Sequence, residues 1–171
     1  MSTAVVQIEG VLQQDNQKLS YVSRPPLQPG MTLWTAITRA YRAMLMTEET
    51  EEDKVRWWIQ SQGVRDFANI LMPPPAWAMK NPEDRVRLQI KALRAAGTDV
   101  GLVVVSNPAV AAVLLQDGVP VSLYCHPRFA RPEYRPGGFK GIRPWADIEA
   151  EVDEQKRLIN LPRPDTAEVV R

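Results

Sequence analysis

A carboxylate and a neutral amide stand at the end of the first apolar run of the chain. The run at residues 4–6 has the composition of a buried strand, and Gly10 allows a sharp turn out of it. Between them, Glu9 offers a carboxylate that can serve as a general acid or base, whereas Gln7 is uncharged and a poor nucleophile. A single carboxylate is also a weak Mg²⁺ site. Gln7 and Glu9 therefore decide whether this strand end performs chemistry.

Polar residues follow two later apolar runs. Thr47 follows the run 43–46, and Ser106 follows the run 102–105 at the start of a predicted helix. The free N–H groups at that helix start could bind an anion. The alternative is that Asn107 simply caps the helix.

These residues need elements that carry them to one edge of the molecule. Apolar runs of strand length alternate with helical patterns, and the expected strands are 4–6, 43–46, 67–72, 102–105 and 119–124. Such alternation predicts a doubly wound, Rossmann-like α/β fold, with a mostly parallel five-stranded sheet and helices on both faces. Right-handed crossovers then place the carboxyl ends of all the strands on one edge.

Start and stop residues predict where the helices lie. The expected helices are 32–42 with Thr32 as N-cap, a helix opened by Thr50 and Asp53 as a capping box and ended by Gly63, 81–97 with Asn81 as N-cap, 109–116, and 145–159. Residues 13–31 form a polar insert bounded by Pro and Gly. Within it, residues 19–22 alternate in polarity and predict a small hairpin or flap.

The order of elements over residues 4–125 resembles the haloacid dehalogenase-like (HAD) superfamily. In that family the first strand ends in Asp-x-Asp-Gly-Thr, where the first Asp attacks phosphorus and the second is the general acid/base. Gln7 and Glu9 stand in these two places, and Val11 replaces the Thr. The insert at 13–31 resembles the family's squiggle and flap.

The resemblance extends to other site positions of the family. Thr47 matches the Ser/Thr that hydrogen-bonds the phosphate, and Lys80 matches the lysine that steadies the charge, although it could equally be a solvated residue before a helix cap. Counted back from Gly118, the two metal-binding Asp positions fall on Ser106 and Val110. The resemblance therefore implies a degenerate single domain over residues 1–160, without a cofactor. Mg²⁺ belongs only to the alternative of a phosphohydrolase or phosphate-ligand binder.

Residues 126–145 form a Pro/Gly-rich loop that combines basic and aromatic side chains. The candidate partner-binding residues in it are Arg128, Phe129, Arg131, Tyr134, Arg135 and Trp145. Such a loop can be a protein-docking surface, can hold single-stranded nucleic acid, or can be an ordered loop whose arginines are solvated.

The C-terminal third also resembles small HAD-like proteins encoded by phages of actinobacteria. Residues 161–171 read as a loose tail.

A second candidate anchor is the tryptophan pair Trp57 and Trp58. Neighbours on a helix lie about 100° apart, so both cannot point fully inward. One is expected in the core. The other is either exposed as an interface anchor or covered by the Pro-rich segment 73–75.

Composition limits the class of protein. A net charge of +1 gives no whole-chain reason to expect nucleic acid or an anionic membrane. No apolar run approaches ~20 residues, which predicts no membrane span, and no secretion signal is evident. The single cysteine, Cys125, fits a reducing, cytoplasmic compartment. The sequence thus predicts a non-catalytic interaction or structural protein of the host cytoplasm or a virion, with a protein partner and no membrane.

Overall fold

The computed structural model describes these residues: 1–125, 150, 154 and 157. The chain divides into two compact units, Met1–Arg135 and Pro136–Arg171. In the second unit the three described residues are helical, and Arg157 pairs with Glu154 at 2.7 Å. All elements below belong to the first unit.

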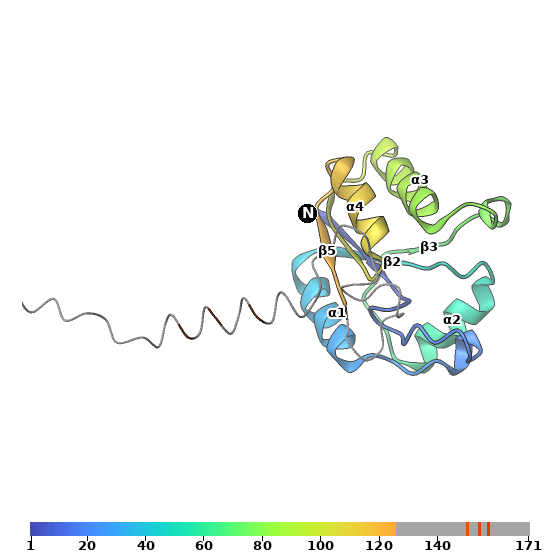
Figure 1. Cartoon of the computed structure of the whole chain (residues 1–171). Helices are drawn as coiled ribbons and strands as arrows, with labels where there is room; N and C mark the ends of the chain where they lie inside the picture. Colours follow the sequence, from blue (N-terminus) through green and yellow to red (C-terminus); the bar gives the residue numbers. More distant parts are fainter. Residues whose placement is uncertain (126–149, 151–153, 155–156, 158–171) are drawn as a thin grey trace, which may run out of the picture. The chain divides into compact units, whose positions relative to one another are not determined.

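Five parallel strands form one sheet in the order β3-β2-β1-β4-β5 (Figure 1). The strands are β1 (Thr3–Gln7), β2 (Arg42–Met46), β3 (Ile70–Leu71), β4 (Val100–Val105) and β5 (Val121–Leu123). The inner strands are almost continuously apolar because a parallel sheet is covered on both faces. The predicted α/β fold with a five-stranded parallel sheet is confirmed.

Among the described residues of the first unit, four helices cover the sheet, two on each face (Figure 1). They are α1 (Gln28–Ala40) and α2 (Glu52–Ser61) on one face, and α3 (Pro82–Ala95) and α4 (Pro108–Gln116) on the other. Two short 3₁₀ helices, η1 (Tyr21–Ser23) and η2 (Pro75–Trp77), lie in the connections. The arrangement is doubly wound and Rossmann-like, as predicted.

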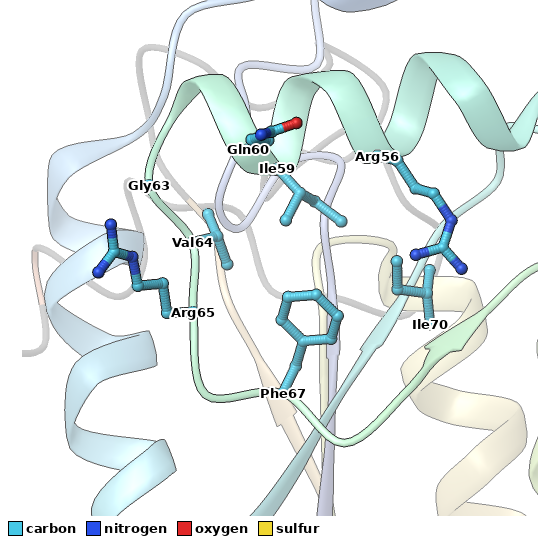
Figure 2. Close-up of a pocket in the computed structure, with 8 residues that line it drawn as sticks. All are labelled: Arg56, Ile59, Gln60, Gly63, Val64, Arg65, Phe67 and Ile70. Carbon is cyan, nitrogen blue, oxygen red and sulfur yellow. The ribbon is translucent and has the colours of Figure 1, made fainter.

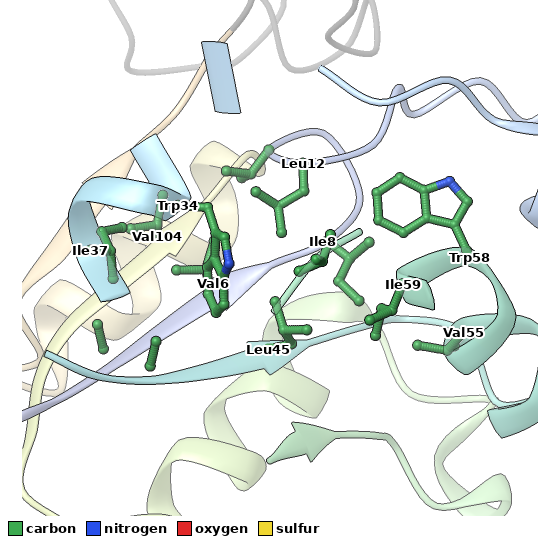
Figure 3. Packing of buried hydrophobic residues seen from close by; sticks show 14 of the residues in the cluster. Val6, Ile8, Leu12, Trp34, Ile37, Leu45, Val55, Trp58, Ile59 and Val104 are labelled. Atoms are coloured by element: carbon green, nitrogen blue, oxygen red, sulfur yellow. The ribbon is translucent and has the colours of Figure 1, made fainter. Parts of the chain in front are cut away.

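Alternate residues of β1 separate the two apolar cores. Ala4 and Val6 pack with α1 and α2, whereas Val5 packs with α3 and α4, as the two-residue period of a strand requires. Figure 3 shows the first core, where the indole of Trp58 closes one end. Trp58 is fully buried and Trp57 is 56% exposed. One tryptophan is therefore a core residue and the other is available to solvent, so cover by the Pro-rich segment does not occur.

The sheet contains a point where the strand order reverses. From β1 the chain proceeds to β2 and β3 on one side and then crosses to β4 and β5 on the other. In open α/β sheets the crevice at the carboxyl ends of the two strands flanking this point is the usual place for a site. Here those strands are β1 and β4, so the loops that follow residues 7 and 105 meet there.

The insert is shorter than predicted because α1 begins at Gln28 rather than Thr32. Pro29 lies in the first helical turn, where its fixed φ suits the helix and its missing N–H costs nothing. The Thr32 hydroxyl donates to the Gln28 carbonyl at 3.1 Å inside the helix and is not a cap. The segment 19–22 contributes to the 3₁₀ turn η1 and forms no hairpin, because the Ser20 and Tyr21 carbonyls accept the N–H groups of Ser23 and Arg24 within that turn.

The start of α2 also differs from the prediction. The helix begins at Glu52, and the proposed capping box of Thr50 and Asp53 is wrong. The N-cap residue is Glu51, which makes no side-chain capping hydrogen bond. The Glu49 carboxylate accepts the N–H groups of Thr50 and Glu51, just before the helix, at 2.8 and 3.1 Å.

Two other helix boundaries follow the prediction. Asn81 caps α3 by accepting the Asp84 N–H at 2.8 Å, and Gly63 follows α2 with a positive φ of 67°. Strand β3 is only two residues long. It is shorter than the predicted strand 67–72 because Ala68 lies in a bend and the Asn69 side chain accepts the Ile70 N–H at 2.8 Å.

Candidate functional site

The Glu9 carboxyl is buried at the point where the strand order reverses. It lies just beyond β1 and is 2% exposed. Two hydroxyl groups donate to its Oε1, those of Thr47, which follows β2, and of Tyr21, at 3.1 Å. The Glu48 N–H donates to Oε2 at 3.3 Å. Both oxygens of Glu9 are thus engaged by groups of the protein itself.

Tyr21 reaches this site from the insert between β1 and α1. Its ring is 6% exposed, and the hydroxyl lies 3.2 Å from the Thr47 hydroxyl as well as within hydrogen-bond reach of Glu9. The Gln13 side-chain amide donates to the Tyr21 carbonyl at 3.0 Å, and the Arg24 guanidinium lies 5.4 Å from the centre of the Tyr21 ring. The insert therefore forms a flap that covers Glu9.

Burial changes the acid–base properties of this cluster. The pKa of Glu9 is raised from 4.5 to about 7 by burial and, to a smaller extent, by the nearby Glu48 charge, and the hydrogen bonds from Thr47 and Tyr21 oppose this rise. Burial and the Glu9 charge also raise the pKa of Tyr21, so that hydroxyl keeps its proton. Near neutral pH both the protonated and the ionised form of Glu9 are therefore populated. Tyr21 remains neutral.

Gln7 connects the loops that follow β2 and β4. Its Oε1 accepts the backbone N–H of Ser106, and its Nε2 donates to Oε1 of Glu48, both at 3.2 Å. The side chain is 3% exposed. A carboxylate at this position could accept the Ser106 N–H but would repel Glu48. The amide therefore serves as a neutral crosslink between two loops.

Gly10 and Ser106 are in close contact across the crevice. The Ser106 hydroxyl donates to the Glu9 carbonyl at 3.0 Å. Gly10 has a φ of 77°, and a Cβ built on it would lie 2.3 Å from the Ser106 Oγ. Glycine is required here both by the backbone conformation and by this approach.

The start of α4 is capped from within the chain. Asn107 accepts the Ala109 N–H at 2.9 Å, and the Ser106 N–H is taken by Gln7. The capping interpretation of Asn107 is thus correct. These two N–H groups are satisfied without an anion.

The structure brings most of the predicted site residues together. Gln7, Glu9, Thr47 and Ser106 meet in the hydrogen-bond network just described. Lys80 is exposed in the turn before α3 and does not line the cavity beside Glu9. Val110 is buried in the core under α4.

The predicted partner-binding loop lies outside the described residues. This concerns Arg128, Phe129, Arg131, Tyr134, Arg135 and Trp145.

Two members of the site escaped the sequence analysis. Tyr21 was expected only as part of a flap, and Glu48 was not among the expected site residues. A tyrosine in a polar insert does not by itself indicate a buried contact, because the residue that it bonds is far away in the sequence. Glu48 had one available signal, because it directly follows Thr47 at the end of a predicted strand.

A polar cavity of about 180 Å³ lies beside the network. Its walls come from the flap and from the segment after β2: Glu9, Gln17, Tyr21, Arg24, Glu48, Glu49 and Thr50. Within the described part of the chain, no three His, Cys, Asp or Glu residues are placed to hold a metal ion together. Three carboxylates line this cavity, those of Glu9, Glu48 and Glu49, and each could contribute a ligand to a metal ion. Among the same residues, no helix combines the length and apolar character needed to cross a membrane.

Comparisons with known proteins bear on the fold. No family model and no curated protein sequence matches the chain. Among the solved structures that resemble it, two match over 73% of its length. One is a chain of the "Pnkp1/Rnl/Hen1 RNA repair complex", with a TM-score of 0.59 and 9% identity. The other is a chain of a "Pnkp1/Rnl/Hen1 complex", with a TM-score of 0.63 and 10% identity. The chain spans 42% and 47% of those two chains, and the likeness shows a shared fold.

Proposed function

We propose that this protein is a catalytically inactive α/β protein of HAD-like type that works by binding a protein partner. One observation carries the proposal. Gln7 and Glu9, which stand where that family has its nucleophile and acid/base, are buried and hydrogen-bonded to other parts of the same chain. The groups that would act on a substrate instead connect three loops.

The chemistry of the two side chains supports the same proposal. In-line attack on phosphorus needs an anionic oxygen, and the Gln7 amide has none. Its two polar atoms are already bound to Ser106 and Glu48. Substrate would have to displace Tyr21 from Glu9 and separate a buried pair of hydrogen-bonded groups, which costs about 1–3 kcal/mol for each group left without a partner.

The partner is proposed to be a protein because suitable anchors are exposed. Trp57 is 56% exposed on α2, and tryptophan and arginine dominate the binding energy of protein interfaces. The structural neighbours are chains of a multi-protein RNA repair complex, which agrees with a fold used within assemblies. The proposal includes a cytoplasmic or virion location and an origin in a phage, the latter supported by the C-terminal resemblance alone.

The absence of catalysis is tested by Mg²⁺-dependent hydrolysis of p-nitrophenyl phosphate. The wild-type protein and Glu9→Gln should give the same rate as buffer. Circular dichroism should show that the variant is folded, and Asp53→Asn provides a matched change of one exposed carboxyl. A wild-type rate above buffer that Glu9→Gln abolishes would support the phosphohydrolase alternative and reject the proposal.

Partner binding is tested by affinity capture from the native host cell or virion with the full chain as bait. The triple variant Arg128→Ala, Arg131→Ala, Arg135→Ala and the single variant Trp57→Ala should each reduce the amount of a specific partner. A triple variant with the same change of charge on exposed residues serves as the control: Arg39→Ala, Arg42→Ala, Lys91→Ala. If all variants captured equal amounts of the partner, the docking role proposed for these residues would be wrong. A complex destroyed by nuclease and by moderate salt would indicate nucleic acid instead.

A further inference from the structure

A second cavity of about 360 Å³ lies between the last turn of α2 and the segment that leads into β3 (Figure 2). Its floor is apolar and consists of Ile59, Val64, Phe67 and Ile70. In Figure 2 the ring of Phe67 points toward Ile59, with the other two side chains on either side of it. The floor therefore presents an aromatic face and three branched aliphatic side chains to whatever enters.

Two arginines stand at opposite ends of this floor. Arg56 projects from α2 beside Ile70, and Arg65 lies beyond Val64 (Figure 2). Arg56 uses its Nε to pair with Glu52 at 2.6 Å. That pair is exposed and leaves the two terminal nitrogens of the Arg56 guanidinium free to donate to another acceptor. The rim is thus cationic at both ends.

The frame of the cavity is held in place before any ligand arrives. The Val64 N–H donates to the Ile59 carbonyl at 3.0 Å, which closes the end of α2. The Arg65 carbonyl accepts the indole N–H of Trp34 at 3.0 Å, which ties the next segment to α1. Pre-formed sites lose less conformational entropy on binding than mobile ones.

Arg65 and Phe67, the two neighbours of Asp66, both line the cavity, whereas Asp66 does not. The backbone of Asp66 is in the left-handed region, with a φ of 64°. A cation and an aromatic ring therefore lie next to the same space.

We propose that this cavity binds a small organic anion with a flat apolar body, such as an aromatic carboxylate or sulfonate. Ligand sites in proteins are concave, have volumes of about 300–1,000 Å³ and combine an apolar lining with a few polar groups that fix orientation. The body of the ligand packs on Phe67, and its acidic group accepts charge-assisted hydrogen bonds from Arg56 or Arg65. Gln60, which also lines the rim, supplies a neutral donor or acceptor.

This site is separate from the Glu9 network. The two cavities share no lining residue. The inference therefore holds whether the protein binds a partner or hydrolyses a phosphoester, and it can fail while the proposed function stands.

The test uses 2-naphthoate as the probe and 2-naphthamide as its neutral isostere, added to the full chain labelled at the isoleucine δ1-methyl groups. On addition of 2-naphthoate we expect saturable changes in the methyl chemical shifts of Ile59 and Ile70. The methyl shift of Ile37, a buried residue of α1, should not change. The amide should bind about tenfold more weakly because it lacks the charge that the arginines recognise.

Substitutions then separate the charge from the apolar floor. Arg56→Gln with Arg65→Gln should raise the Kd of 2-naphthoate about tenfold and leave that of 2-naphthamide unchanged, whereas Arg39→Gln with Arg42→Gln should change neither. Phe67→Leu, which keeps an apolar side chain at this position but removes the ring, should weaken both probes. Absence of shifts at Ile59 and Ile70 at millimolar probe, or equal Kd values for acid and amide, would overturn the proposal.

Discussion

The Tyr21 hydroxyl donates a hydrogen bond to Oε1 of Glu9 at 3.1 Å and so covers the carboxyl that follows β1, at the crevice where the strand order reverses. The two residues are 12 positions apart and belong to different elements, a flap and a strand end. Their contact places an aromatic ring over the carboxyl that would otherwise face a ligand. The crevice is thus occupied by the chain itself, and its polar groups stabilise the fold.

Tyr21→Phe tests how much this contact stabilises the protein. The change removes the hydroxyl but keeps the ring, and it leaves an oxygen of Glu9 with one donor fewer. We expect the free energy of unfolding to fall by about 1–2 kcal/mol, as measured by urea denaturation. Tyr41→Phe, at the half-buried end of α1, should change it by less than about 0.5 kcal/mol. Equal effects of the two substitutions would contradict a specific role for the Tyr21 hydroxyl.

Glu9 should make the stability of the protein depend on pH. Its pKa is raised to about 7 in the folded state from 4.5, so the folded state binds the proton more tightly than the unfolded chain does. The stabilisation from this proton is complete below pH 4.5 and is lost as pH rises to about 7. The loss amounts to about 3 kcal/mol.

The measurement is urea denaturation at pH 5 and pH 8. Wild-type protein should be less stable at pH 8 by most of that amount, and Glu9→Gln, which has no proton to lose, should show little of this difference. Asp53→Asn, an exposed carboxyl, should keep the wild-type difference. The interpretation fails if wild type and Glu9→Gln have the same pH dependence.

Gly10→Ala should be strongly destabilising. The substitution meets both a positive φ and the side chain of Ser106, and we expect a loss of roughly 2–4 kcal/mol. Gly97→Ala is a matched control, since Gly97 also has a positive φ but nothing within 4 Å of the added Cβ. It should cost only about 1 kcal/mol. Combining Gly10→Ala with Ser106→Gly should recover the part of the loss that comes from the steric contact.

The two neighbouring tryptophans should differ sharply in their effect on stability. Trp58→Ala removes a fully buried indole, which also donates to the Arg24 carbonyl at 2.8 Å, and should cost about 3–5 kcal/mol. Trp57→Ala should change the free energy of unfolding by less than about 0.5 kcal/mol because its side chain is largely exposed. Thermal denaturation of the two variants distinguishes them. A large loss with Trp57→Ala would show that this residue packs against the protein and is not a free anchor.

Much of the fold could be predicted from local patterns. Continuous apolar runs marked β1, β2 and β4, and an Asn-Pro pair marked the start of α3 and of α4. These signals are local because burial on both faces and N-terminal capping each depend on residues close in sequence. The less accurate boundaries have local causes. Pro29 starts α1 early, the Glu49 carboxylate binds the backbone N–H groups just before α2, and a bend at Ala68 shortens β3.

The sequence could predict which residues lie at the site, but not which contacts they make there. The sequence indicated that Gln7, Glu9, Thr47 and Ser106 follow strands and so share one edge, because parallel strands end on the same side. It could not indicate that Tyr21 would cover Glu9, since that contact depends on how a polar insert folds back. Nor could it place Arg56, Arg65 and Phe67 around one cavity.

The sequence by itself determined which chemistry is available at the strand ends, because an amide at residue 7 has no negative charge in any conformation. The tertiary structure decided what the remaining carboxylate does. Packing removes Glu9 from water and places Tyr21, Thr47 and Glu48 around it, so its pKa and its hydrogen bonds depend on contacts between residues up to 39 positions apart. Charge is a property of a residue type, whereas burial and partners arise only when distant segments pack together.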